Sequence, residues 1–293
     1  MAVPTTSPLP ATPGAGRHPG DAVGRSWTVQ VAAVAIVVVL LVPLVPLVLF
    51  SFGQGYFHPQ VLPEVWGLRA WRIVLARGAG TWPALVDSVR LAGLVTVVSL
   101  ALAVPAGRAL ALYRFPGRRL VEFLLLAPVL VPTIAVALGL HVALLRLGLA
   151  GTLVGVALVH LVPVTPYVVL IMAGTFANLD PDFEAQARSL GASWPAVWRS
   201  VTLPAIAPGL ATAAFLGFLV SWGQYALTLV VGGGRVVTLP ILLFASAAGG
   251  DTAVTSALAL FTTVPAVLLL AVNARALAGR RAGGWAWGPE AGR

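Results

Sequence analysis

Six long apolar runs limit the folds that are open to this chain of 293 residues. A helix needs about 20 mostly apolar residues to cross the hydrocarbon core of a bilayer. Inside lipid, only helices and closed barrels satisfy their own backbone hydrogen bonds. We therefore expect an all-α membrane protein with six transmembrane helices, over residues 29–52, 86–112, 121–146, 150–177, 208–231 and 252–273.

Composition narrows the function. Only 9% of the residues are charged, whereas soluble domains carry about 25%. The chain has no cysteine, and all 18 of its basic residues are arginine. Without lysine it cannot form a P-loop for ATP, and its four histidines show no metal-binding spacing. We read the net charge of +9 as arginines at the membrane borders, which indicates a lipid environment and no nucleic-acid partner.

The segments around the apolar runs define the expected organisation. Residues 1–27 are rich in Pro, Ala, Gly, Ser and Thr, so we expect a disordered cytoplasmic tail. Residues 28–84 are expected to form the first transmembrane helix and a periplasmic connection, residues 85–273 the membrane core, and residues 274–293 a second cytoplasmic tail. Twelve of the 18 arginines would lie on the side of both termini, and the positive-inside rule makes that side cytoplasmic.

A polar stretch, EAQARSLGASWPAVWRSVTLP, occupies residues 184–204 between the fourth and fifth runs. Asp180 has the position of a helix N-cap, and Gly191 is expected to end the first helix with a positive φ. A second short helix is expected to begin near Ser193 and to end at Pro204. The stretch therefore predicts two short helices joined at a glycine.

Apolar residues recur in this stretch at helical spacing. They form two stripes, Phe183, Ala187, Leu190 and Trp194, and then Trp194, Val197, Trp198 and Val201. Glu184 and Arg188 are expected to pair at i,i+4. Two readings stay open at this point: helices that lie flat on the membrane surface, or a rigid knob that docks on a soluble partner, with Ala185 and Ala187 allowing close approach.

The stretch resembles the cytoplasmic EAA loop of permease subunits of binding-protein-dependent ABC importers. That loop has Glu-Ala-Ala, three residues, Gly, nine residues, Ile, one residue and Leu-Pro. Here Gly191 is followed at the same spacing by Val201, Leu203 and Pro204. The front half departs, because Ala185 falls on the family's Glu and Glu184 lies one residue earlier. Residues 114–119 (RFPGRR) and 87–92 (DSVRLA) are weaker matches.

The resemblance implies a permease core over residues 85–273 in a bacterial inner membrane. The expected substrate is a small solute such as a polyamine, a thiamine-like compound, iron or an oxyanion. The implied partners are two ABC ATPase subunits, a second permease of the same or a different chain, and an extracytoplasmic substrate-binding protein. ATP and Mg would be bound by the ATPase, so this chain would hold no cofactor and catalyse no reaction.

The resemblance assigns coupling to the ATPase to one loop. Its residues are Phe183, Glu184, Ala185, Ala187, Leu190, Gly191, Trp194, Leu203 and Pro204. The coupling-helix pair would then lie between transmembrane helices four and five.

Polar residues inside the runs are candidates for the substrate pathway, because polar groups at membrane depth face protein or water. Ser221, Gln224 and Thr228 would share one face of the fifth helix, and Thr165 between two prolines would mark a broken helix. The other reading of these residues is interhelical hydrogen bonding. His160 is read as a packing group rather than a ligand.

Two other classes of membrane protein agree less well with the sequence. An ion-coupled secondary transporter needs ionisable groups near the midplane, whereas Asp87, Glu122 and Asp251 fall at the ends of the runs. A membrane-bound enzyme built on Ser221 and His160 would lack any GxSxG or metal motif.

The arginine distribution predicts that both termini and residues 178–207 are cytoplasmic. The variants Ser193→Cys and Gly233→Cys can be labelled singly with an impermeant maleimide, because the chain has no other cysteine. In whole cells we expect labelling at position 233 and none at position 193 until the membrane is permeabilised. The reverse pattern would invert the orientation.

Overall fold

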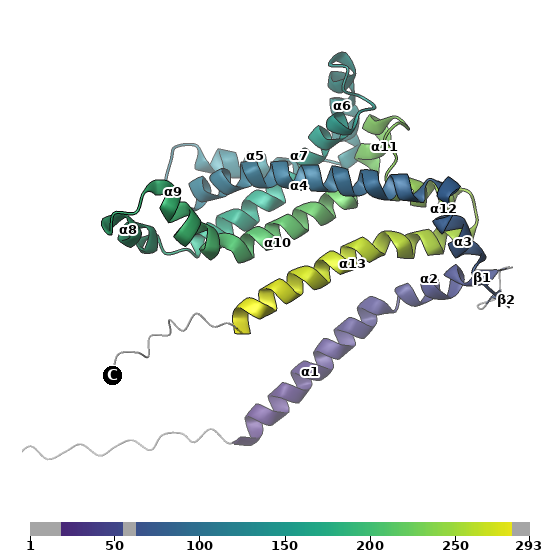
Figure 1. The fold of residues 1–293 in the computed structure, drawn as a ribbon, viewed down its shortest axis with the longest axis horizontal. Helices are drawn as coiled ribbons and strands as arrows, with labels where there is room; N and C mark the ends of the chain where they lie inside the picture. Colours follow the sequence, from purple (N-terminus) through teal and green to yellow (C-terminus); the bar gives the residue numbers. More distant parts are fainter. Residues whose placement is uncertain (1–18, 55–62, 283–293) are drawn as a thin grey trace, which may run out of the picture. The chain divides into compact units, whose positions relative to one another are not determined.

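The computed structural model of the chain describes residues 19–54 and 63–282 (Figure 1), with only the backbone described at 19–26, 40, 54 and 276–282. The chain divides into two units, residues 1–47 and 48–293, which are described separately. In the first unit, α1 (Pro19–Leu41) begins inside the segment that we expected to be a disordered tail. The rest of that tail, and residues 283–293 of the second tail, lie outside the described residues.

The second unit is almost entirely helical. Its long helices are α4 (Thr81–Leu112), α7 (Leu153–Ala177), α10 (Leu203–Trp222) and α13 (Thr252–Ala282). Its shorter helices are α3 (Arg69–Leu75), α5 (Arg118–Leu130), α6 (Thr133–Arg146), α8 (Asp182–Ser189), α9 (Trp194–Val197), α11 (Ala226–Gly232) and α12 (Leu239–Ala248). The remaining elements are a 3-10 turn, η1 (Arg77–Ala79), a π-turn, η2 (Trp198–Thr202), and the antiparallel pair β1 (Gly53–Gln54) and β2 (Val65–Trp66). The helix α2 (Leu44–Ser51) leads from the first unit into the second.

The core of the second unit lies between α4, α7 and α10, which run side by side in Figure 1. Two glycines permit the close approach of these helices. A Cβ on Gly107 of α4 would lie 2.7 Å from the backbone nitrogen of Ala173 in α7, and a Cβ on Gly209 of α10 would overlap the side chain of Thr175. Small residues at such contacts are typical of membrane helix packing.

The six expected spans are only partly reproduced. Four helices are long and apolar enough to cross a membrane: Thr81–Leu112, Leu153–Ala177, Trp194–Trp222 and Thr252–Arg275. The described residues reach six spans only if each of two bent helix pairs counts as one, over the first and third expected runs. The third run is bent by 102° between α5 and α6, because Pro132 lacks an N–H and holds Val131 in an extended conformation. The prediction of one uninterrupted helix over residues 121–146 is therefore wrong.

The fifth run also differs from the prediction. Its helix begins before residue 208, and it is interrupted between Trp222 at the end of α10 and Ala226 at the start of α11. In contrast, α7 continues through Pro163 and Pro166, so the break that we expected at Thr165 is absent. Neighbouring helices in a bundle re-satisfy backbone groups freed by proline, whereas Gly223 is free to end a helix.

The connection after the first run is more structured than expected. It contains the β1–β2 pair, whose strands flank the undescribed residues 55–62, and the helix α3. Arg69 of α3 donates a hydrogen bond of 2.9 Å to Asp251, which lies just before α13. The short helix α12 was missed, because its ten residues are too few to register as a span.

A buried hydrogen-bond cluster bridges the interruption between α10 and α11. His160 of α7 is fully buried, with Nδ1 3.0 Å from Ser221 Oγ and Nε2 2.9 Å from Thr228 Oγ1. The Thr228 hydroxyl donates to the carbonyl of Gln224 at 2.8 Å. This bond uses the only proton of the Thr228 hydroxyl. A neutral His160 therefore donates a hydrogen bond from Nε2 to Thr228 Oγ1 and accepts one at Nδ1 from the Ser221 hydroxyl. One imidazole thus holds both halves of the broken run against α7.

Replacement of His160 should destabilise the protein by leaving buried hydroxyls without this partner. We expect His160→Leu to lower stability by about 1–3 kcal/mol and to lower the thermal midpoint of the detergent-purified protein. The matched control is His141→Leu, because the half-buried His141 of α6 has an Nδ1 atom without a hydrogen-bond partner in the part of the chain that the structure describes. Equal midpoints for the two variants would contradict the bridging role.

Candidate functional site

The loop between α7 and α10 projects from one end of the helical core (Figure 1). Its first helix, α8, begins at Asp182, one residue later than predicted, with Pro181 at the N-cap position. The expected capping contact is present, since Asp180 Oδ1 accepts the backbone N–H of Asp182 at 3.0 Å. After α8 the chain turns at Gly191, whose φ of +89° confirms the expected left-handed conformation. Apart from its chain neighbours, no described residue has an atom within 4 Å of a Cβ built at Gly191, so the requirement for glycine there comes from backbone conformation.

The second expected helix does not end at Pro204. Residues Trp194–Trp222 form one continuous helix in which η2 is a π-turn. The N–H of Leu203 bonds to the carbonyl of Trp198, five residues earlier. Proline in a regular α-helix clashes with the carbonyl four residues before it, and the wider turn before Pro204 relieves this clash. Such π-turns are often found at functional sites.

The helix α8 is inverted relative to an ordinary surface helix, which buries its apolar stripe and exposes its charges. Glu184 is the only buried residue of α8, at 8% exposure. Phe183 is 55% exposed, and beyond the helix Leu190 and Trp194 are 89% and 66% exposed. The Glu184 carboxylate faces the protein, and the large apolar side chains face away from it, beside the exposed Asp182 and Arg188.

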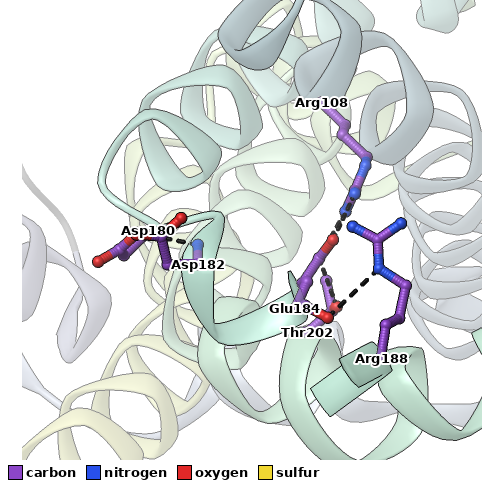
Figure 2. Close-up of polar contacts among 6 residues, drawn as sticks. All are labelled: Arg108, Asp180, Asp182, Glu184, Arg188 and Thr202. Carbon is purple, nitrogen blue, oxygen red and sulfur yellow. Dashed lines mark hydrogen bonds and ion pairs between the residues drawn. The ribbon is translucent and has the colours of Figure 1, made fainter. Parts of the chain in front are cut away.

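Glu184 is held by Arg108 and Thr202, and we call these three residues the Glu184 clamp (Figure 2). Arg108 of α4 donates two hydrogen bonds, from Nη1 to Oε1 at 2.8 Å and from Nη2 to Oε2 at 2.6 Å. Thr202 of η2 donates to Oε1 at 2.6 Å. The guanidinium carbon of Arg108 also lies 5.7 Å from the ring centroid of Phe176 and 5.4 Å from that of Trp198. The clamp therefore joins α4, α7, α8 and η2.

Arg188 does not pair with the Glu184 carboxylate as we predicted. Its Nε atom donates to the backbone carbonyl of Glu184 at 3.4 Å, because the carboxylate is turned toward Arg108. The hydrogen bonds from Arg108, followed by the bond from Thr202, lower the pKa of Glu184 to about 2 in spite of its burial. Glu184 is therefore ionised at neutral pH, and its stabilising contacts are lost only as the pH falls below about 4.5 toward 2.

The sequence missed Arg108 and Thr202 as members of this site. The sequence analysis placed Arg108 only among the arginines on the cytoplasmic side. A charged residue inside an apolar run needs a partner, however, and this signal pointed to a buried ion pair. Glu184 lies 76 residues away along the chain, so no local spacing joins the two.

The other residues expected in the coupling loop are mostly exposed. Ala185, Leu203 and Pro204 are exposed, and Ala187 is half-buried. The ring of Trp194 packs on that of Trp198 at 5.6 Å. In the second stripe Val197 is buried and Trp198 and Val201 are half-buried, so only the part after the exposed Trp194 faces the protein.

The residues expected to line the pathway are brought together only in part. Ser221 and Thr228 are buried against His160, which agrees with the interhelical reading, while Gln224 lies in the interruption of the run rather than on a shared helical face. Thr165 is half-buried, with its hydroxyl 3.4 Å from that of Ser99. A pathway role for these four residues stays a prediction.

Comparison with known proteins gives the family. Residues 103–280 match the family described as binding-protein-dependent transport system inner membrane component. The molybdenum transport system permease protein ModB of Mycobacterium tuberculosis is 31% identical over 224 residues, which are 71% of this chain and 83% of that protein.

Two crystal structures share the fold. A chain of a bacterial ABC transporter involved in the import of the acidic polysaccharide alginate is 20% identical, with a TM-score of 0.63, over 89% of this chain and 98% of its own length. A chain from a bacterial alginate ABC transporter in complex with an alginate pentasaccharide-bound periplasmic protein is 13% identical, with a TM-score of 0.59, over 88% and 96%. The chain therefore belongs to the permease subunits of binding-protein-dependent ABC importers, which are membrane transport subunits rather than enzymes.

Proposed function

We propose that α8 and the following turn are the coupling element through which this permease docks on a separate ABC ATPase subunit. ATP and Mg would be bound by that subunit, in agreement with a chain that has no lysine for a P-loop. The observation that carries the proposal is the inversion of α8, which buries Glu184 and exposes Phe183 and Leu190.

An exposed apolar surface of this kind indicates a partner surface. The alternative, a helix that lies on the membrane, fits less well, because the first turn of the loop carries the exposed acids Asp180 and Asp182. The headgroups of a cytoplasmic leaflet are anionic and repel such acids. The exposed Arg188 and Arg199 only balance the two acids, so the loop lacks the basic face of a membrane-surface helix. A protein partner with an apolar cleft fits both the exposed side chains and the acids beside them.

The assembly and its substrate follow by similarity. We propose six spans with both termini in the cytoplasm, two ATPase subunits, and a second permease of the same or a different chain. The alginate transporter complex supports an extracytoplasmic substrate-binding protein as a further partner. Among the small solutes expected from the sequence, an oxyanion agrees best with the molybdenum transport relative.

The docking role predicts that the exposed apolar side chains supply much of the affinity for the ATPase. We expect the double variant Phe183→Ala/Leu190→Ala to lose about 2 kcal/mol or more of binding free energy, which is an affinity roughly thirtyfold lower. Ala187→Asp should be at least as damaging, since it adds an unpaired charge to the contact. Affinity of the partner ATPase for the permease in nanodiscs measures both effects.

A matched control is available in α5. Phe123 and Leu124 are 61% and 58% exposed and are chemically the same pair. The variant Phe123→Ala/Leu124→Ala should bind the ATPase as the wild type does. Wild-type affinity in all three variants would remove the docking role of α8.

A further inference from the structure

The helix α8 is connected to some helices covalently and to α4 only by noncovalent contact. Covalently, α8 continues from α7 and leads through Gly191 into the helix that contains α10. Its link to α4 is noncovalent and consists of the bidentate ion pair between Glu184 and Arg108. No other residue of α8 is buried, so apolar packing does not hold the helix in place.

Arg108 is well suited to hold this link during a movement. Its guanidinium lies near the rings of Phe176 and Trp198, and its side chain is only 19% exposed. A bidentate arginine–carboxylate pair fixes both distance and orientation, which a single lysine contact does not. Thr202 occupies Oε1 from the side of η2, so the carboxylate cannot rotate away without losing a third bond.

Beyond the clamp, α4 reaches the opposite end of the second unit. Its 32 residues span about 48 Å as a helix, and it packs along both α7 and α10. Near its other end Ser88 Oγ accepts the backbone N–H of Leu239 at 2.8 Å, in the first turn of α12. Figure 1 shows α8 and α12 at opposite ends of α4.

We infer that Arg108 is a positioning residue that carries displacement of α8 into α4, and through the contact between Ser88 and Leu239 to α12. The inference rests on the proposed docking of α8 on an ATPase and adds a path for the movement. Without the ion pair, a displaced α8 acts directly only on α7 and α10, and movement reaches α4 and α12 only through the packing of those helices on α4.

The test uses a reporter at the far end of this path. Thr238 is 3% exposed beside Leu239, and its hydroxyl has no hydrogen-bond partner among the described residues, so Thr238→Cys removes none of the side-chain hydrogen bonds described. In the complex with the partner ATPase, the rate of maleimide reaction at this cysteine is measured with and without ATP plus vanadate. The parent complex is expected to show a nucleotide-dependent rate.

In the Thr238→Cys background, Arg108→Gln and Glu184→Gln should each strongly reduce the nucleotide dependence while the ATPase stays bound. The double variant should be no worse than either single variant, because both act through one pair. The control is Arg114→Gln, which neutralises an exposed arginine near the same end of α4 and should keep the parent response.

Three results would overturn the inference. The first is a labelling rate in the parent complex that does not change with nucleotide, and the second is an unchanged response in Arg108→Gln. The third is loss of the ATPase from Arg108→Gln, which would make Arg108 part of the docking site. Failure of the docking proposal gives a different result, namely ATPase that stays bound to Phe183→Ala/Leu190→Ala.

Discussion

The bidentate ion pair between Arg108 and Glu184 is the interaction on which the loop depends. A partly buried carboxylate is tolerable only with a charge partner and further hydrogen bonds, and Arg108 and Thr202 supply both. Because the acid holds α8 to the bundle, Phe183 and Leu190 are free to face outward. The same pair explains how a short helix without apolar packing keeps a defined place.

Prolines and glycines decide where the helices of this chain are regular. Pro132 separates α5 from α6 by a sharp bend, and Pro204 is accommodated by the π-turn that positions Thr202 beside Glu184. Gly223 follows the end of α10, where His160 holds the two halves of the fifth run. The backbone irregularities and the polar clusters therefore occur at the same places in the fold.

Local signals were sufficient for part of this structure. Asp180 and Gly191 predicted the bounds of α8, because capping and positive φ depend on neighbouring residues. Hydropathy located the apolar runs but not their breaks. A proline interrupts the helix in one run, whereas in another run the helix continues through its prolines, and the packing around each proline decides which occurs. The partner of Glu184 was out of reach, because Arg108 is 76 residues away and only tertiary packing brings the two together.

Amide hydrogen exchange across α8 in the purified permease tests most directly whether the ion pair holds this helix in place. Loss of charge-assisted hydrogen bonds worth about 1.5 kcal/mol or more in Glu184→Gln should speed exchange over residues 182–189 by roughly tenfold. Phe183→Ala should leave that exchange nearly unchanged, because its side chain is 55% exposed in the free subunit. Equal protection in Glu184→Gln and wild type, or loss of protection in Phe183→Ala, would contradict the claim that the ion pair holds α8.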